Sequence, residues 1–575
     1  MLNLLLGAMA SAALTRAAAS SPIPVGTALH WDVSSDSAQP TYRFRYRKLG
    51  SDYQMIRDFS SATSLDWNAP LTEGAYELEM TARDATTGDV SSSTEMLQVT
   101  PRTGADGMPV VSPTAHPLVF LYSAAACGGG RRIRIEFTGS DGVAHRTPYQ
   151  SCSSRETSNV YLAGLYADAD YNAHQIVDTG SAFKQGPDVP FHTGSLPDGL
   201  FTEVPLQSPP DKVSNPVLLG TSSSNGSVAT GLDGRAIWYL PAGPVSFIAR
   251  PESGGYFWGY LEDFSAGPSG NFIRKLDLAG SIVLETNAAR VSEQLAARGK
   301  RAISGFHHEV RTLPDGRIVA LATVEQMMTG VQGPGPIDIL GDMIIVFDRD
   351  LNVVWTWDAF DNLDVTRKAV LGETCAASGA CSPHFLAADG NDWTHGNAVQ
   401  QTPDGNFLYS SRHQDWLIKI SYDNGEGDGH IIWRMGKGGD FAPLSSDAYP
   451  WFSHQHDGNF LLSDPGTLLV YDDGNTRVSE LHEGHSRGQV FQVDESRFTV
   501  TPVVNADLGV YSLAVGSAQR LRNGDFAFDS GFVPEDNSVV SYSAQVNAAG
   551  NIVYQAKANA ILYRTFRMAD MYSPN

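Results

Sequence analysis

Three histidines that precede glycine turns at matching distances are the residues whose spacing points most directly to chemistry. Each stands eight or ten residues before its glycine: His395 before Gly405, His456 before Gly466 and His308 before Gly316. Because side chains alternate along a strand, even offsets place the three imidazoles on one face, and His307 points the other way unless a bulge exchanges it with His308. The spacing predicts that His308, His395 and His456 converge from three repeats.

An arginine is expected beside one of these histidines. Arg412 follows Gly405 by seven residues, and the Pro-Asp-Gly sequence that ends at Gly405 is typical of a hairpin turn. The two strands of a hairpin fold back on each other, so Arg412 and His395 should meet at the same end. A lone histidine at a strand end is usually a surface residue, but three at matching offsets beside an arginine favour a functional set.

Imidazoles around a guanidinium suit the transfer of a compact anionic group. One histidine would attack as nucleophile, the others would move protons, and Arg412 would stabilise the anionic oxygens. Three histidines could instead hold zinc in a metal-dependent hydrolase or lyase, although a neighbouring arginine would repel a dication. A non-catalytic, ligand-binding protein is the third alternative. We expect neither a metal nor a cofactor. The remaining histidines near turns are interpreted as surface residues: His413, His430, His482 and His485.

A strand-like repeat must position these residues. A turn followed by β-branched and aromatic residues recurs six times, in the segments 234–240, 280–286, 352–357, 429–435, 488–493 and 550–556. Six four-stranded blades around a central channel fit this recurrence, which predicts a six-bladed β-propeller over residues 211–575. Fewer, larger sheets stay open as an alternative.

The segments before the repeat also have β patterns, so the predicted class is all-β. Residues 23–103 alternate apolar and polar positions between turn clusters, as in an immunoglobulin-like or fibronectin-like sandwich. Residues 104–210 form a second β-sandwich-like accessory domain. Within the whole chain, only residues 287–304 have a convincing helical pattern.

Composition limits the classes of partner. The chain has 575 residues with 63 acidic and 40 basic side chains, for a formal net charge of −23. Because no Lys/Arg-rich run offsets this charge, nucleic acid and anionic membranes are poor partners and a small molecule is favoured. No segment has the roughly 18 apolar residues that a transmembrane helix needs.

The N-terminus and the cysteines suggest export. Residues 1–22 resemble a secretory signal peptide, with small residues near the expected cleavage point. In an exported protein, two disulfides are the simplest account of the four cysteines, Cys127 with Cys152 and Cys375 with Cys381. In a cytosolic protein, all four would be ordinary thiols.

An ordered set of motifs resembles the aryl-sulfate sulfotransferase family. The motifs are Phe306-His-His-Glu, Asp392-Trp-Thr-His-Gly-Asn, Ser410-Ser-Arg, Ile432-Trp-Arg-Met-Gly, Gln455-His-Asp and Gly516-Ser-Ala-Gln-Arg-Leu-Arg-Asn-Gly. The resemblance spans residues 105 to 565 approximately. It implies a periplasmic or secreted propeller that moves a sulfuryl group from a phenolic sulfate ester to an acceptor phenol without a nucleotide donor. The sequence also lacks a phosphate-cradling Gly-x-x-x-x-Gly-Lys-Ser/Thr loop.

The resemblance also implies residue roles. His456 matches the histidine that becomes transiently sulfated, so a ping-pong mechanism is expected. His395, Arg412 and one of His307 and His308 match residues that bind the sulfuryl oxygens and shuttle protons. Asn397 matches a residue that lines the same pocket. The implied partners are an aryl sulfate donor and a phenolic acceptor, and a homo-oligomer stays open.

Overall fold

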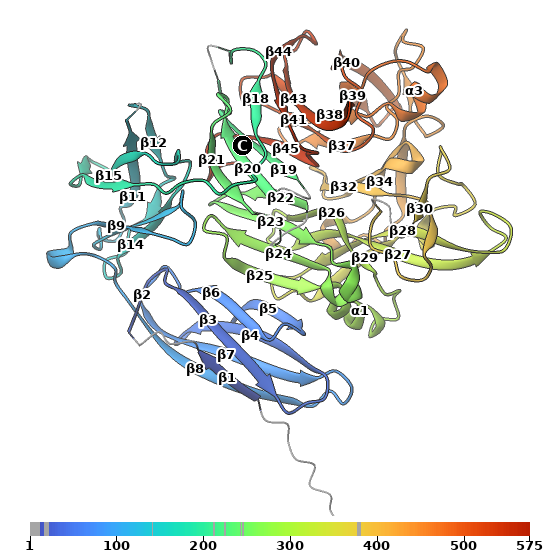
Figure 1. Ribbon diagram of the computed structural model, residues 1–575. Helices are drawn as coiled ribbons and strands as arrows, with labels where there is room; N and C mark the ends of the chain where they lie inside the picture. The colour runs from blue at the N-terminus through green and yellow to red at the C-terminus, as the bar shows by residue number, and fades with distance from the viewer. Residues whose placement is uncertain are drawn as a thin grey trace, which may run out of the picture. The chain divides into compact units, whose positions relative to one another are not determined.

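The protein is described by a computed structural model (Figure 1). It describes residues 12–16, 22–140, 142–210, 213–222, 226–241, 243, 247–376 and 381–574. Contacts divide the chain into two compact units. The first unit holds residues 1–197, 254–257 and 274–290, and the second holds residues 198–253, 258–273 and 291–575.

The first part of unit 1 is a two-sheet sandwich. One sheet has the order β1-β3-β6, and the other includes the run β2-β8-β7-β4-β5. Trp31, Phe44 and Leu78 belong to the buried core, and the alternating burial along the strands explains the sequence pattern. The strands are β1 (Ala12–Arg16), β2 (Ile23–Pro24), β3 (Ala28–Ser35), β4 (Pro40–Lys48), β5 (Gln54–Ser60), β6 (Ser64–Asn68), β7 (Gly74–Asp84) and β8 (Val90–Thr100).

The second part of unit 1 has a separate core that includes Tyr122, Ile135 and Phe137. Its sheets have the orders β14-β10-β9 and β12-β11-β15-β16, with β13 and β17 at their sides. The strands are β9 (Val110–Pro113), β10 (Phe120–Ala124), β11 (Arg132–Gly139), β12 (Ala144–Arg146), β13 (Gln150–Ser151), β14 (Ser158–Leu162), β15 (Asp170–Asp178), β16 (Phe183–Gln185) and β17 (Val189–His192). The Cys127–Cys152 disulfide joins this core.

Unit 2 is built from a series of mainly antiparallel sheets. The first two are β18 (Glu203–Pro205) with β41 (Gly516–Arg520), β42 (Phe526–Glu535), β43 (Ser538–Val546) and β44 (Ile552–Ala558), and β19 (Val217–Ser222), β20 (Gly226–Gly231) and β21 (Ala236–Leu240) with β45 (Arg564–Met568). In the second of these sheets, the last strand of the chain, β45, pairs with β19. The beginning and end of this unit therefore share a sheet.

Three further sheets come from continuous stretches of chain. The first holds β26 (Gly305–Thr312), β27 (Ile318–Thr329), β28 (Pro336–Phe347) and β29 (Val353–Asp358), with β30 (Thr374–Ala376) and β31 (Asp389–Asp392); the second holds β32 (Gly396–Gln401), β33 (Phe407–Ser411), β34 (Trp416–Ile420) and β35 (Ile431–Met435); the third holds β36 (Ala442–Pro443), β37 (His456–Leu461), β38 (Asp464–Asp472), β39 (Arg487–Asp494) and β40 (Thr499–Asp507). Between β21 and β26 lie β22 (Phe247–Glu252), β23 (Tyr256–Leu261), β24 (Phe272–Asp277) and β25 (Ile282–Asn287).

Hydrophobic cores lie between successive sheets of unit 2. Trp357 and Tyr409, from the β29 and β33 sheets, share one core. Trp433 and Phe491 share the next, and Tyr471 with Phe528 belong to a third. Each sheet is thus covered on its faces by its neighbours, which explains why its strands are apolar on both sides.

Six end strands of these sheets also follow one another in space. β22 contacts β26, β26 contacts β32, β32 contacts β37, β37 contacts β41, β41 contacts β45, and β45 contacts β22. Of the histidines that the spacing had singled out, His308 lies in β26, His395 directly precedes β32, and His456 begins β37. These end strands are the elements that position the candidate site.

The predicted all-β class is confirmed, with three short α-helices among the described residues: α1 (Ala288–Ala296), α2 (Ala359–Asn362) and α3 (Asn475–Leu481). The helix expected over 287–304 is α1, which ends before Gly299, where φ is +68°. Each of the six repeated segments forms a strand, namely β21, β25, β29, β35, β39 and β44. β18 pairs with β44, so unit 2 begins before the boundary expected at residue 211.

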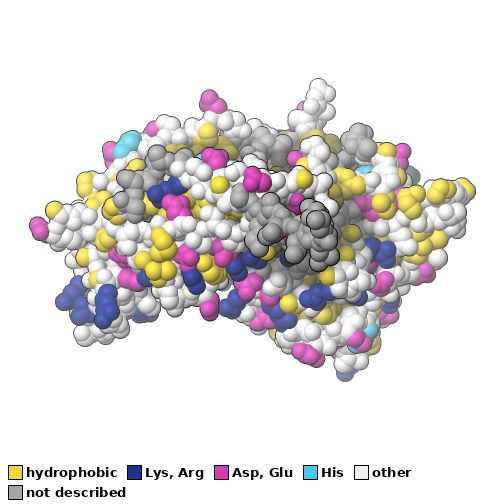
Figure 2. All heavy atoms as spheres, turned by 90° about the horizontal axis from the view of Figure 1, so that it is seen from below, with side chains coloured by type: hydrophobic (Ala, Val, Ile, Leu, Met, Phe, Trp, Pro, Cys, Tyr) yellow, Lys and Arg dark blue, Asp and Glu magenta, His cyan; other side chains and the backbone are white. Residues whose placement is uncertain are grey.

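The surface and the N-terminus bear on two other expectations. Figure 2 shows acidic side chains scattered among basic ones over the face in view, so the negative charge is not gathered there into one patch. None of the helices in the described ranges is long and apolar enough to cross a bilayer. Within the predicted signal peptide, residues 12–16 form β1, while residues 1–11 and 17–21 lie outside the described residues.

Candidate active site

Each of the three histidine strands carries a β-bulge where its histidine lies. The register shifts between His307 and Val310 in β26, after Gly396 in β32, and after His456 in β37. The backbone is left-handed at His308, with φ of +59°, and at His395, with φ of +46°. Such bulges and strained backbones re-aim side chains and recur beside active sites.

The bulge in β26 separates the two neighbouring histidines. The rings of His308 and His395 lie 4.7 Å apart between centroids. His307 is buried and directs Nε2 to Asp342, at 3.0 Å from Oδ1, while its Nδ1 lies 2.8 Å from Nδ1 of His308. Burial and the neighbouring His395 hold the pKa of His308 well below its ordinary value, so this imidazole is neutral near pH 7.

His456 is held by a buried carboxylate. Its Nδ1 lies 2.7 Å from Oδ2 of Asp473, and only 1% of the residue is exposed. Burial and the charge of Arg412 keep the pKa of His456 well below its ordinary value. The ring is therefore neutral, and no hydrogen-bond partner for its Nε2 is found among the described residues. Tyr563 lies between His456 and His308, at centroid distances of 6.4 and 5.4 Å.

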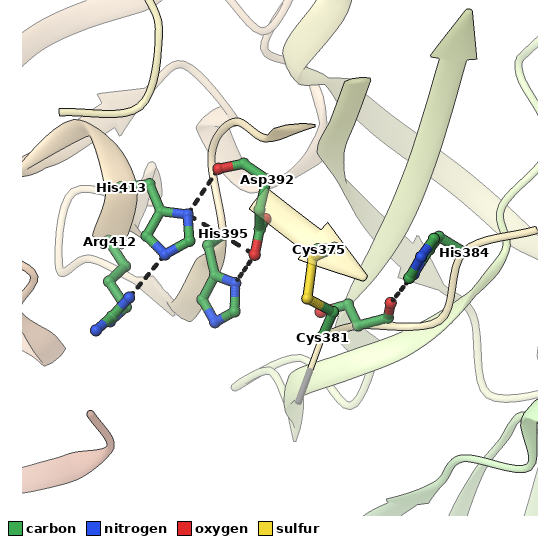
Figure 3. Close-up of a disulfide and its surroundings, with 8 residues drawn as sticks. Cys375, Cys381, His384, Asp392, His395, Arg412 and His413 are labelled. Atoms are coloured by element: carbon green, nitrogen blue, oxygen red, sulfur yellow. Dashed lines mark hydrogen bonds and ion pairs between the residues drawn. A yellow bond between two sulfur atoms is a disulfide. The ribbon is translucent and has the colours of Figure 1, made fainter. Parts of the chain in front are cut away.

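Asp392 organises a second pair of histidines, as Figure 3 shows. Nδ1 of His395 lies 2.6 Å from Oδ2 of Asp392, and Nδ1 of His413 donates to the Asp392 backbone carbonyl at 2.7 Å. The two rings stack at 4.5 Å. The surface interpretation of His413 was wrong, because this ring is buried between His395 and Arg412. His430, His482 and His485 are exposed, as expected.

Arg412 begins a 3-10 turn directly after β33 and meets His395 through the backbone, where its N–H donates to the His395 carbonyl at 3.3 Å. The guanidinium is buried, at 8% exposure, and donates to Nε2 of His413 at 2.7 Å and to the Leu513 carbonyl at 3.1 Å. Its Nε has no partner, and no carboxylate in the described part of the chain forms an ion pair with it. A buried guanidinium without a carboxylate partner is suited to bind an anion.

His454, which the sequence analysis passed over, completes this cluster. Its Nδ1 lies 2.8 Å from Oδ1 of Asp415, and its Nε2 contacts Glu373. Burial opposes a charge on this ring, but the hydrogen bonds to Asp415 and Glu373 outweigh it and raise the pKa of His454. The site thus combines neutral imidazoles with one that favours the protonated form. The position of His454 two residues before His456 was the available signal.

Asn397 and Arg564 close the site on another side. Asn397 donates to the Gln455 carbonyl at 2.7 Å, and its own buried Oδ1 has no partner. Arg564, fully buried, donates to the Asn397 carbonyl at 2.6 Å and pairs with Glu309 at 3.0 Å. Sequence reasoning missed Arg564 and Tyr563, because β45 carries no glycine-turn repeat that would have marked them.

The second disulfide lies next to these residues. Cys375 in β30 is bonded to Cys381 with a Cα–Cα distance of 5.7 Å, and β30 pairs with β31, which ends at Asp392. Both cysteine pairs are those expected from the sequence. The bond therefore braces the strand that carries the carboxylate of His395.

Apart from a group that contains the disulfide-bonded Cys375 and Cys381, two groups of side chains in the described residues have the spacing of a metal site: Glu373 with His413 and His454, and Asp392 with His395 and His413. His413 belongs to both, yet its Nδ1 donates to a carbonyl and its Nε2 accepts from Arg412. A ring nitrogen that accepts from a guanidinium has no lone pair left for a metal. These contacts favour an anion over a cation at the cluster.

Comparisons with known proteins bear on the same region. A family model described as Arylsulfotransferase (ASST) matches residues 204–564, a range that includes all of the histidines and arginines of the site. No curated protein matches the chain.

Among solved structures, the chain is similar to the chicken CNTN1 FN1–FN3 domains, with 12% identity, a TM-score of 0.13, and coverage of 30% of this chain and 65% of that chain. It therefore spans less than two thirds of that structure's length. It is also similar to a segment of two fibronectin type-III domains from chicken tenascin, with 14% identity, a TM-score of 0.14, and coverage of 32% and 98%.

Proposed function

Because the chain belongs to the arylsulfotransferase family, we propose that it transfers a sulfuryl group from a phenolic sulfate ester to an acceptor phenol through a sulfated His456, without a nucleotide. The observation that carries the proposal is a neutral His456 that is held by Asp473 and whose pKa is lowered by burial and by the charge of Arg412. The Arg412 guanidinium itself has no carboxylate partner among the described residues. One group supplies a lone pair, and the other supplies a place for an anion.

In the first half-reaction, Nε2 of His456 attacks the sulfur of the donor ester. The N–S bond forms, the bond between sulfur and the phenolic oxygen breaks, and the phenolate leaves with the electron pair. Asp473 accepts the Nδ1 proton in a hydrogen bond and stabilises the positive charge that develops on the ring. Arg412 and the protonated His454 stabilise the sulfuryl oxygens and the phenolate.

In the second half-reaction, the oxygen of the acceptor phenol attacks the same sulfur and the N–S bond breaks back to neutral His456. His308 takes the phenolic proton, because its ring is neutral and only half-buried. His395, held by Asp392 and placed directly before the neighbouring strand β32, orients the sulfuryl group. The donor's phenolate and the acceptor occupy the same place in turn, which is the basis of ping-pong kinetics.

The fold that supports this site is, we infer, a six-bladed β-propeller. The supporting observation is the cyclic order of contacts among β22, β26, β32, β37, β41 and β45, together with the pairing of β45 and β19. A ring of inner strands places the histidines of three sheets around one channel. The two disulfides favour an oxidising compartment, so a periplasmic or secreted location fits the same proposal.

Turnover with p-nitrophenyl sulfate and a phenol, in buffer free of nucleotide, tests the proposal. We expect nitrophenol release and a sulfated phenol, with parallel lines in double-reciprocal plots as the acceptor concentration varies. The same assay after treatment with a chelator separates this proposal from a metal-dependent hydrolase, which would lose activity. Absence of transfer from any aryl sulfate would contradict the proposal.

A further inference from the structure

A cavity in unit 2 lies toward the carboxyl ends of β26, β32 and β37, away from the ends at which the histidines lie. Its volume is about 650 Å³, a size that suits a small organic ligand. In β37, His456 is the first residue, whereas Asn459, Phe460 and Leu461 at the other end line the cavity. In β26, His308 lies near the start and Arg311 near the end. The cavity is therefore distinct from the histidine site.

The lining is strongly basic, although the chain as a whole is acidic. Arg250, Arg311, Arg520 and Arg522 line the cavity, and Asp457 is the one acidic residue among the described residues that do so. The formal net charge of the whole chain is −23. The lining of the cavity therefore has the opposite sign of charge from the chain as a whole.

The positive charge is not neutralised within the protein. Buried Glu309 is shared by three arginines, with distances of 2.7 Å to Arg250, 2.9 Å to Arg311 and 3.0 Å to Arg564. Asp457 lies 3.4 Å from Arg564 and 4.0 Å from Arg250. Two carboxylates thus face three guanidiniums. A buried surplus charge is costly unless an ion of opposite sign pairs with it.

Two further guanidinium groups line the cavity, those of Arg520 and Arg522. Arg520 is half-buried and Arg522 is exposed, so a ligand can reach both. Arg520 lies over the ring of Phe526, at 4.5 Å, and neither Arg520 nor Arg522 forms an ion pair with a carboxylate in the described ranges. Guanidiniums presented in this way bind carboxylate, sulfate or sulfonate groups with paired hydrogen bonds.

The remaining lining is apolar or neutral. Phe460, Leu461, Leu462 and Phe566 present hydrocarbon, while Gln400, Asn459 and Gln519 present amides. An inorganic ion would leave this apolar surface unused. A ligand with an anionic head and an aromatic or aliphatic body would cover both kinds of surface.

We infer that this cavity is a second binding site, for a small organic anion whose charged head pairs with Arg520 and Arg522 and whose apolar body packs on Phe460 and Phe566. The site goes beyond the proposed transfer reaction and does not depend on it. The arginines hold the head group, and β37 and β45, which carry Phe460 and Phe566, position the body.

Titration calorimetry with 4-methylbenzenesulfonate tests this site. The carbon–sulfur bond of this probe is not an ester bond, so the probe reports binding whether or not the protein transfers sulfuryl groups. We expect binding to persist in Arg412→Gln, which removes the anion partner at the histidines. We expect Arg520→Gln/Arg522→Gln to weaken this residual binding at least about tenfold. The exposed Arg497, with an 81% exposed side chain, offers a matched control, and Arg497→Gln should bind as the wild type does.

Two results of the variant experiments would overturn the inference. In the first, Arg412→Gln abolishes all binding, which assigns the probe to the histidine site alone. In the second, the double variant keeps the wild-type affinity while its unliganded melting temperature is unchanged. Inorganic sulfate serves as a second probe, and we expect it to bind at least about tenfold more weakly than the sulfonate because it leaves the apolar lining uncovered. Equal affinity would contradict an organic ligand.

Discussion

At the scale of single residues, the carboxylates behind the histidines decide what each ring can do. Asp473 fixes Nδ1 of His456 at 2.7 Å, and Asp392 fixes Nδ1 of His395 at 2.6 Å. His454 differs because two carboxylates surround it and raise its pKa. Identical side chains thus acquire different protonation states from their partners.

Asp473→Asn tests the role of the carboxylate. An amide can no longer hold the Nδ1–H tautomer of His456 firmly, so kcat should fall by about 10²-fold or more while KM for the aryl sulfate changes little. Steady-state kinetics measure both. Asp428→Asn is the matched control, because Asp428 lies 2.6 Å from Nδ1 of His430 in an exposed pair. A rise in KM with an unchanged kcat would count against a positioning role for Asp473.

The pH dependence of the first half-reaction follows from the state of His456. Burial and Arg412 lower its pKa below the ordinary value of 6.5, so the nucleophile stays neutral as pH falls from 8 to 6.5. The single-turnover burst of nitrophenol should therefore not decline as pH falls over this range, and should decline only at more acid pH. Samples returned to pH 7 after acid exposure control for inactivation. A half-loss of rate at or above pH 6.5 would contradict this account.

Residue spacing in the sequence singled out His308, His395, His456 and Arg412, and the structure brings His308 next to His395 and Arg412 next to His413. His413 was misjudged because a position near a turn was taken as a sign of exposure. The 3-10 turn after β33 instead folds the chain inward. Burial of a turn depends on neighbouring sheets, which local sequence does not reveal.

At the scale of elements, the bulges rather than regular strand alternation direct the histidines. Even offsets from the turn place side chains on one face only in a regular strand, yet β26, β32 and β37 all shift register beside their histidines. The repeat of turns and apolar residues was enough to predict six of the strands, but not how many strands each sheet contains. Bulges depend on a single extra residue, and no pattern in this sequence marks them.

Gly396→Ala tests the packing that supports the β32 bulge. A Cβ at Gly396 would lie 2.4 Å from Cε2 of Tyr409 and 3.0 Å from Oδ2 of Asp342. We expect a loss of about 1–3 kcal/mol in unfolding free energy, together with a lower kcat because His395 and Asn397 flank the glycine. Denaturant titration and kinetics measure these effects. Gly129→Ala, where a Cβ meets nothing within 4 Å, should leave both unchanged. Normal activity in Gly396→Ala would show that the bulge tolerates displacement.

At the scale of the whole molecule, the candidate site is built entirely from unit 2, and each unit has its own disulfide. The order of the β segments along the chain could be predicted from composition and alternation. Their grouping could not, because contacts between sheets that are distant in sequence define the units. β18 is an example, since it pairs with β44 at the other end of the chain.

Removing each disulfide separately tests whether only the disulfide of unit 2 supports the candidate site. Cys375→Ala/Cys381→Ala should reduce transfer activity, because the bond braces β30 and β31 next to Asp392. Cys127→Ala/Cys152→Ala should lower the melting temperature of its own unit and leave kcat near the wild-type value. Calorimetry and kinetics on both variants make the comparison. Equal losses of kcat in the two variants would contradict it.

The most direct test of the central claim is the intact mass of the protein after brief exposure to an aryl sulfate without an acceptor, quenched under non-acidic conditions. We predict a gain of one sulfuryl group in the wild type, its loss on addition of a phenol, and no gain in His456→Ala. A wild type that transfers sulfuryl groups without ever gaining this mass, or a His456→Ala variant that still gains it, would contradict the account.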